Sequence, residues 1–248
     1  MLLTNWIRDF GKYVLLMKRV FTKPDRWNMF GRQYLHESTG LVIDSIGIIG
    51  IISLFIGAVS CIQIQKNLDN PFLPQYLIGF ATREMLMLEF SSAILCLILA
   101  GKVGSNIASE IGTMRVTEQI DAMEIMGVNS ANYLILPKVC AVISLMPILV
   151  ILSIALGLVG GGILCMLTGQ PTVDDYVTGI QFYFDISHID YAIQKSMIFG
   201  FIITTVSGYF GYTVNGGALQ VGRNSTQAVV ISSIMILMAD VVSTKLLL

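Results

Sequence analysis

Three acidic residues lie close together in a short polar segment, residues 112–129, that separates two apolar stretches of the chain. Glu118, Asp121 and Glu124 follow one another at intervals of three, so a helix from Arg115 to Met126 places them on one arc. The opposite stripe of that helix is apolar and contains Val116, Ile120 and Met123. Such a helix can rest on membrane helices and offer its acidic arc to a basic groove of another protein. The alternative is an amphipathic loop helix that has no partner.

Six other charged residues lie within or at the edge of apolar stretches: Asp44, Arg83, Glu84, Glu89, Lys102 and Asp240. Charges at such depth in a membrane are costly, and they usually mark a transport pathway or an ion pair. Arg83 and Glu84 are adjacent, which fits either a pair with a substrate role or an anchoring pair at head-group level. The alternative function, a secondary transporter or a membrane scaffold subunit without an ATPase, would use the acids Asp44, Glu89 and Asp240 as proton carriers.

Several familiar kinds of chemistry are missing from the sequence. No GxxxxGK[ST] loop is present, so the chain does not cradle nucleotide phosphates itself, and any ATP must be bound by a partner. His36 and His188 lie outside the apolar stretches, and no Ser, His and Asp arrangement or ligand cluster is visible. The spacing of the four cysteines matches neither a disulfide framework nor a metal site. We therefore expect a protein that is not an enzyme and that holds no cofactor or metal of its own.

The composition places the chain in a membrane. Hydrophobic residues make up 54% of it, charged residues make up 12%, and the mean hydropathy is +0.75. A net charge of −1 gives no basic excess that would favour nucleic acid as a partner. About 20 apolar residues span a bilayer. Five segments qualify, namely 41–64, 85–103, 139–167, 196–214 and 228–247. We expect an all-α integral membrane protein with a single transmembrane domain over residues 1–248.

The N-terminal region, residues 5–35, begins with an amphipathic helical pattern. Its apolar side chains are helically spaced, and they are Trp6, Phe10, Tyr13, Val14, Met17 and Phe21. Arg8, Lys12 and Arg19 fall on the opposite arc. This pattern predicts a helix that lies in the bilayer interface, with its basic residues at anionic head groups. An ordinary amphipathic helix packed on protein is the alternative.

The basic residues predict the orientation in the membrane. Eleven of the 15 Lys and Arg residues fall on the side that holds the N-terminus and the connections 102–138 and 215–227. Loops rich in Lys and Arg stay in the cytoplasm. We therefore expect the N-terminus and residues 112–129 to be cytoplasmic, and the C-terminus to lie outside after five spans.

The run from Ala100 to Val139, AGKVGSNIASEIGTMRVTEQIDAMEIMGVNSANYLILPKV, resembles the signature region of the MlaE-type permeases. These are the membrane subunits of bacterial ABC transporters associated with MCE proteins. The resemblance extends upstream to Arg83 and Glu84, and to GGALQVGRNSTQAVVISSIMILMADVVSTKLL near the C-terminus. It covers most of the chain, and its EQIDAM core is distinctive.

The resemblance implies a fold, partners and a cargo. The fold has an N-terminal interfacial helix and five transmembrane helices, with a short cytoplasmic coupling helix between the second and third. The permease works as a homodimer in the bacterial inner membrane, with two cytoplasmic ATPase subunits and often a small STAS-domain subunit. It moves phospholipids or related lipids between that membrane and a periplasmic MCE protein.

The resemblance also implies roles for individual residues. The EQIDAM region resembles the coupling helix that docks into the ATPase, which assigns this role to Glu118, Gln119, Asp121 and Met123; Arg115 and Glu124 lie on the same predicted helix. The Arg-Glu pair at the head of the second span lies near the lipid cavity in that family. This places Arg83, Glu84 and the neighbouring Met85 at the cavity edge.

The chain departs from the family pattern after Arg-Glu. The family commonly continues with Leu-Gly-Pro, whereas this chain has Met85-Leu86-Met87 and then Glu89. We expect a straighter start to this helix and a different cavity wall. For Asp44 the resemblance implies no role.

Overall fold

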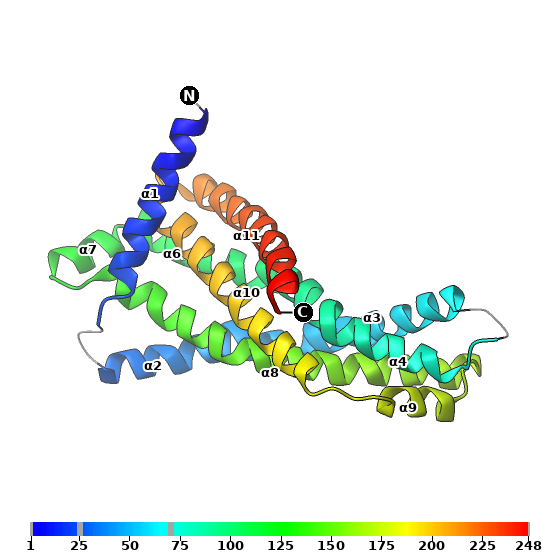
Figure 1. The fold of residues 1–248 in the computed structure, drawn as a ribbon. Coiled ribbons are helices and arrows are strands. Elements are labelled where there is room, and N and C mark those ends of the chain that lie inside the picture. Colours follow the sequence, from blue (N-terminus) through cyan, green and yellow to red (C-terminus); the bar gives the residue numbers. More distant parts are fainter. Residues whose placement is uncertain (1, 24–26, 69–71, 248) are drawn as a thin grey trace. The chain divides into compact units, whose positions relative to one another are not determined.

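The computed structural model describes residues 2–23, 27–68 and 72–247, and the side chains from residue 8 to residue 246 outside those gaps. Within these ranges all regular structure is helical, which confirms the predicted all-α class (Figure 1). The α-helices are α1 (Leu2–Val20), α2 (Trp27–Glu37), α3 (Ile46–Asn67), α4 (Tyr76–Met85), α5 (Leu95–Leu99), α6 (Ser105–Val116), α7 (Gln119–Ile125), α8 (Ser130–Thr168), α9 (Val173–Gln181), α10 (Ser187–Tyr212) and α11 (Ala218–Leu247). Short π and 3-10 helices, η1 (Ser38–Val42), η2 (Ile43–Ser45), η3 (Leu86–Ile94) and η4 (Ala100–Gly104), lie between them.

Four helical runs in the described residues are long and apolar enough to cross a membrane: Trp27–Asn67, Tyr76–Val116, Ser130–Thr168 and Ala218–Leu246. They contain four of the predicted spans. The fifth prediction, residues 196–214, falls mainly in α10, which is not among these runs. Lys195 and several hydroxyl and glycine residues lower the mean hydropathy of α10. Four candidate spans therefore make the chain a multi-pass membrane protein.

The chain folds as two compact units, each of which is described by itself. The first unit contains Met1–Asp44, Ile98–Leu145 and Ile198–Ala239, and thus includes α1, α2, α6 and α7. The second contains Ser45–Leu97, Met146–Met197 and Asp240–Leu248, and thus includes α3, α4 and α9. Helices α8, α10 and α11 contribute residues to both units.

Small residues allow close helix packing in the second unit. A Cβ atom on Gly57 of α3 would overlap the backbone carbonyl of Gly157 on α8, and one on Gly160 would overlap the carbonyl of Leu54. The Ser53 hydroxyl donates to the Ser153 hydroxyl at 2.8 Å beside this crossing. Close backbone contact and interhelical hydrogen bonds hold helices together where no water drives their association.

A buried lysine connects three helices of the first unit. Lys138 on α8 is 1% exposed, and its Nζ atom lies 2.7 Å from Glu37 Oε2 and 2.8 Å from Glu110 Oε2. These acids belong to α2 and α6. Because a buried charge is tolerated only with partners, this ion cluster fixes the three helices to one another.

Helix α1 forms where the amphipathic pattern predicts a helix, and it contacts α10 in the first unit, while its place in the bilayer interface stays a prediction. The Tyr13 hydroxyl donates to Thr205 Oγ1 on α10 at 3.0 Å, and Met17 and Val20 are buried. Phe10 remains 68% exposed. The side chain of Trp6, which belongs to the predicted apolar stripe, lies outside the described residues, as do residues 24–26 of the predicted interfacial region.

Candidate functional site

The predicted helix from Arg115 to Met126 is interrupted. Helix α6 ends at Val116, and α7 begins at Gln119. Between them Glu118 has a φ of 60°, a left-handed conformation that is uncommon outside glycine. The prediction of one continuous helix is therefore wrong, because the left-handed residue redirects the chain and starts a second, shorter helix.

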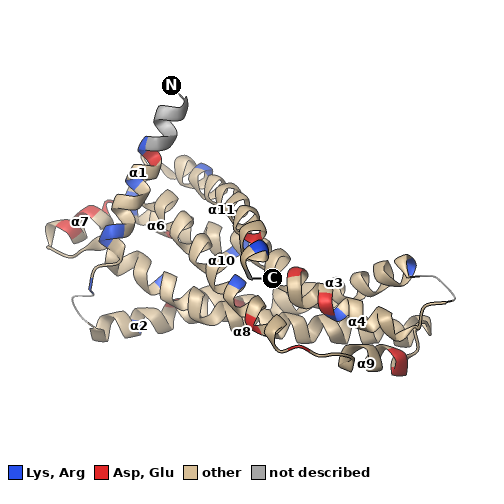
Figure 2. Cartoon of the chain, in the orientation of Figure 1, with Lys and Arg blue, Asp and Glu red and all other residues tan. Residues whose placement is uncertain are grey.

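This break changes where the acidic side chains point. Asp121 Oδ1 accepts a hydrogen bond from Arg115 Nη1 at 2.6 Å, across the turn between α6 and α7. Glu124 Oε1 accepts from Arg19 Nη2 of α1 at 2.8 Å. Glu118 and Gln119 remain exposed. Figure 2 shows the acidic residues of α7 close to basic residues of α1. Two of the three predicted docking acids thus have partners within the same unit.

The exposed surface at the end of α7 is apolar. Ile125 is 88% exposed and Met126 is 71% exposed, and Gly127 follows them in the left-handed conformation with a φ of 78°. Ile120, on the predicted apolar stripe, is fully buried. These two adjacent apolar side chains lie outside the four candidate spans, so they are available for contact with another molecule. Sequence reasoning assigned no role to Ile125 and Met126.

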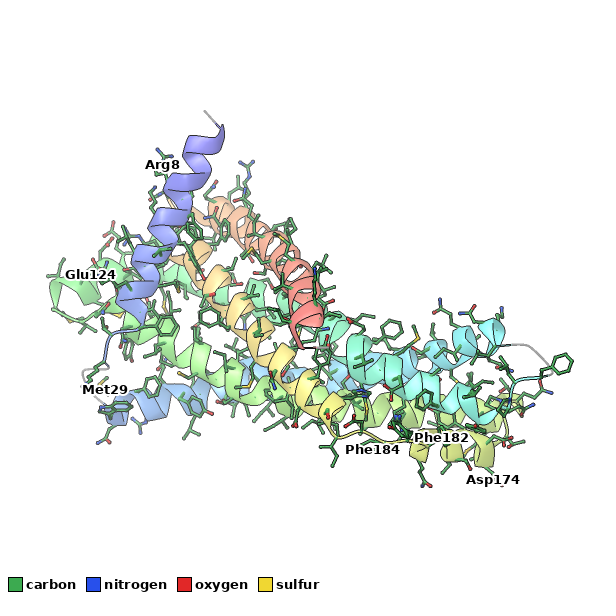
Figure 3. All side chains as sticks on the ribbon, in the orientation of Figure 1. Arg8, Met29, Glu124, Asp174, Phe182 and Phe184 are labelled. Atoms are coloured by element: carbon green, nitrogen blue, oxygen red, sulfur yellow. The ribbon has the colours of Figure 1, made fainter. Side chains whose placement is uncertain are left out.

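A cavity of about 500 Å³ lies beside this apolar surface. Its lining comes from α2, α7 and the start of α8, and includes Met29, Phe30, Met123, Met126, Asn132, Tyr133 and Pro137. Methionine is flexible and polarizable, and it is common at surfaces that adapt to a partner. Met123, which was predicted to take part in docking, lines this cavity. Figure 3 labels Met29 and Glu124 on this part of the chain.

Arg83 lies on α4 and is fully buried in the second unit. Its Nη1 atom donates to the carbonyl oxygens of Ile180 at 2.7 Å and Phe182 at 2.9 Å, and its Nη2 atom donates to that of Tyr183 at 3.1 Å. The guanidinium also binds Glu84 Oε1 through Nε at 3.1 Å and through Nη2.

Aromatic rings complete this environment. The Arg83 guanidinium carbon lies 5.0 Å from the Phe80 ring centroid and 5.5 Å from that of Phe184. Phe182 and Phe184, labelled in Figure 3, belong to the segment that follows α9. Because backbone carbonyls and aromatic rings surround Arg83, its main structural role is to attach the segment after α9 to α4.

Glu84 has a second partner that sequence reasoning missed. Its Oε2 atom lies 2.9 Å from Nδ1 of His188, near the start of α10, and both side chains are partly exposed. Met85, the next predicted site residue, is 42% exposed. No spacing in the sequence indicates this pairing, since Glu84 and His188 lie on different helices far apart in the chain.

A second ion cluster of the same unit lies around Lys195 of α10. The Nζ atom of this fully buried residue lies 3.1 Å from Glu89 Oε2 and also binds Asp240 Oδ1. It donates to Thr244 Oγ1 at 3.3 Å and lies 4.8 Å from the Tyr191 ring centroid. Glu89 and Asp240, predicted candidates, are therefore brought together by Lys195, which lies one position before the predicted span 196–214.

The remaining membrane-edge charges, Lys102 and Asp44, belong to the first unit. Lys102 Nζ donates to the backbone carbonyl oxygen of Asp44 at 2.7 Å, and the Asp44 side chain is exposed.

After Met85 the helix continues without a break as the π-helix η3, which carries Glu89. π-Helical turns are rare in proteins overall, but where they occur they are often found at functional sites.

Comparisons with known proteins agree with these observations. A family model described as "Permease MlaE" matches residues 34–246. The chain is 36% identical to a probable ABC transporter permease protein of Rickettsia bellii, over 96% of this chain and 92% of that protein. It is 30% identical to the probable ABC transporter permease protein slr1045 of Synechocystis, over 96% of this chain and 90% of that protein.

A plant protein is also similar. The chain is 32% identical to Protein TRIGALACTOSYLDIACYLGLYCEROL 1, chloroplastic, of Arabidopsis thaliana, over 80% of this chain and 56% of that longer protein. Similarity of this extent, in bacteria and in a chloroplast protein, covers both units of the chain.

Proposed function

The chain belongs to the MlaE permease family, and from this premise we propose that it moves phospholipids or related lipids between the bacterial inner membrane and a periplasmic MCE protein. It does so as a homodimer bound to cytoplasmic ABC ATPase subunits, with a STAS-domain subunit as a further candidate partner. A permease of an ABC transporter requires ATPase subunits, and this chain has no nucleotide-binding loop of its own.

The observation that carries the ATPase contact is the exposed apolar pair, Ile125 and Met126, at the end of α7. An ATPase subunit that covers this pair and the adjoining cavity removes large apolar side chains from water, which favours binding. Glu118, in the turn before α7, and Gln119, the first residue of α7, are exposed and form the polar rim of the contact. Met123 acts from within the cavity, and Arg115 and Asp121 hold the turn in shape.

The lipid contact in this proposal lies at Arg83, Glu84 and Met85. The guanidinium has its donors on three carbonyls and on Glu84, so a phosphate oxygen reaches it only by replacing one of these acceptors. Glu84 and His188 are partly exposed beside it, and Met85 offers an apolar contact for an acyl chain. In this arrangement Arg83 positions Glu84 and the segment after α9 at the head-group site. It binds the phosphate directly only when that segment moves.

Replacing Ile125 with aspartate is expected to weaken binding of the ATPase subunit at least ~30-fold, because loss of a buried interface anchor costs about 2 kcal/mol or more. Co-purification and titration of the ATPase with the detergent-solubilised permease measure this effect. Val177→Asp is the matched control, since Val177 is an exposed apolar residue on the short helix α9 of the other unit. Charge reversal at Glu118 should weaken ATPase binding less than Ile125→Asp does. Unchanged ATPase binding in Ile125→Asp would refute the apolar docking surface.

A further inference from the structure

The C-terminal end of helix α1 is bound by two asparagines that follow α7. Asn132 Nδ2 donates to the carbonyl oxygens of Val20 and Thr22, both at 2.7 Å. Asn129 Nδ2 donates to the carbonyl oxygen of Arg19 and to Thr22 Oγ1, both at 3.0 Å. The last carbonyls of a helix have no partners within the helix. These two amides supply partners, and so they attach the end of α1 to the turn between α7 and α8.

Glu124 joins three further donors at the same place. Its Oε1 atom accepts from Arg19 of α1 at 2.8 Å, from Ser130 of α8 at 3.0 Å and from Tyr212 of α10 at 2.9 Å. The Ser130 and Tyr212 hydroxyl oxygens lie 2.9 Å apart, but each hydroxyl has one proton, so when both donate to Glu124 they do not also donate to each other. A single carboxylate oxygen on α7 thus connects α7 with three other helices of the first unit.

The hydrogen bonds to Glu124 favour its ionised form. Hydrogen bonds from Tyr212 and Arg19 lower the pKa of Glu124 below its ordinary value. Glu124 is therefore an anion at neutral pH, and all three hydrogen bonds to it are assisted by its charge. An exposed pair between Arg19 and Glu124 alone would contribute little. The convergence of three donors on one carboxylate oxygen makes the network stronger than that pair.

Helix α1 is also bound along its length to α10. The Tyr209 hydroxyl donates to the carbonyl oxygen of Asp9 at 3.2 Å, and the Tyr13 hydroxyl donates to Thr205. The rings of Tyr13 and Tyr209 meet edge to face with centroids 5.7 Å apart. Any displacement of α7 must therefore carry α1 and α10 with it or break the bonds to Glu124.

We propose that Glu124 is a positioning residue that transmits movement of α7 to α1 and α10, so that the N-terminal helix moves in each transport cycle. Glu124 acts inside the permease and does not contact the ATPase. This inference rests on the proposed function, because it takes the ATPase bound at α7 as the source of the movement. It replaces the docking role predicted for Glu124 with a role in transmission.

The test compares Glu124→Gln with Tyr212→Phe in the complete transporter complex, reconstituted with labelled phospholipid. Tyr212→Phe removes one donor to Glu124 and leaves the surface of α7 unchanged. Both variants are expected to bind the ATPase within about twofold of the parent. Both are expected to lower the lipid moved per ATP hydrolysed by at least about fivefold, the size of effect expected when one hydrogen bond in a coupled network is lost. Tyr34→Phe, which removes a hydroxyl bonded to Ser144 at 2.8 Å in the same unit, is the control and should behave like the parent.

Two results would overturn the inference. One is an unchanged ratio of lipid to ATP in both variants. The other is a loss of ATPase binding in Glu124→Gln while Tyr212→Phe matches the parent, since that pattern means direct contact with the ATPase. Hydrogen exchange at the end of α1, with and without ATP, separates this inference from the lipid assignment. If the parent moves no lipid, the proposed cargo fails, yet an ATP-dependent change in α1 that Tyr212→Phe suppresses still supports transmission.

Discussion

Replacing Arg83 with alanine is expected to lower the free energy of unfolding of the permease by about 3–5 kcal/mol, because the change leaves buried partners without a cation. The carbonyls of Ile180, Phe182 and Tyr183 lose their donor, and Glu84 loses its ion pair. For a chain of this length the melting temperature should fall on the order of 10 °C. A thermal melt of the purified permease in one detergent measures the change.

Two further variants separate charge from geometry at this site. Arg83→Lys keeps the charge but lacks the planar fork that reaches several acceptors at once, so it should lose most of the stability as well. Glu84→Gln leaves the three bonds to the carbonyls in place and should cost clearly less than Arg83→Ala. If Arg83→Ala melts like the parent and retains the same amount of lipid, neither a structural nor a head-group role for Arg83 holds.

Replacing Lys195 with methionine is expected to destabilise the permease by about 3–5 kcal/mol, because two acids lose the cation buried between them. Methionine is similar to lysine in length, so the effect reports the charge more than a cavity. Thermal melting of the single variant against the parent measures it. Glu89, whose side chain is 39% exposed, and Asp240, whose side chain is 17% exposed, then repel each other, and neither has another cation within the described contacts.

Neutralising Glu89 and Asp240 tests whether unpaired negative charge causes the destabilisation of Lys195→Met. The double variant Lys195→Met with Asp240→Asn should melt at a higher temperature than Lys195→Met alone, since one unpaired carboxylate is gone. Adding Glu89→Gln should raise it again. Non-additive effects of this kind identify residues that interact directly. A double variant that is no more stable than the single one would contradict the ion cluster.

Hydropathy and helical periodicity predicted much of the fold. Four predicted spans lie within long helical runs, and α1 forms where the amphipathic pattern placed a helix. These signals are local, since they depend only on residues that follow one another along one helix. A helical segment around Asp121 was also predicted, because its polar residues interrupt two apolar stretches, but as one helix from Arg115 to Met126 and not as two helices separated at Glu118.

Long-range contacts and unusual backbone geometry were not predictable in this way. Lys195 lies one position outside the predicted span 196–214, and nothing near it in the sequence points to its partners Glu89 and Asp240, which lie on distant segments. Nothing in the residue types marks Glu118 as left-handed. For this reason the acids of α7 were predicted on one docking arc, whereas Glu124 faces other helices of its own unit.

We propose that this chain moves lipid with energy supplied by a separate ATPase. The most direct measurement follows isotope-labelled phospholipid in vesicles that contain the permease with its ATPase subunits, with ATP or a non-hydrolysable analogue. We predict lipid movement to an added MCE protein that requires ATP hydrolysis and that Ile125→Asp largely removes. Movement that the permease alone supports, driven by a proton gradient and independent of ATP, would contradict the account.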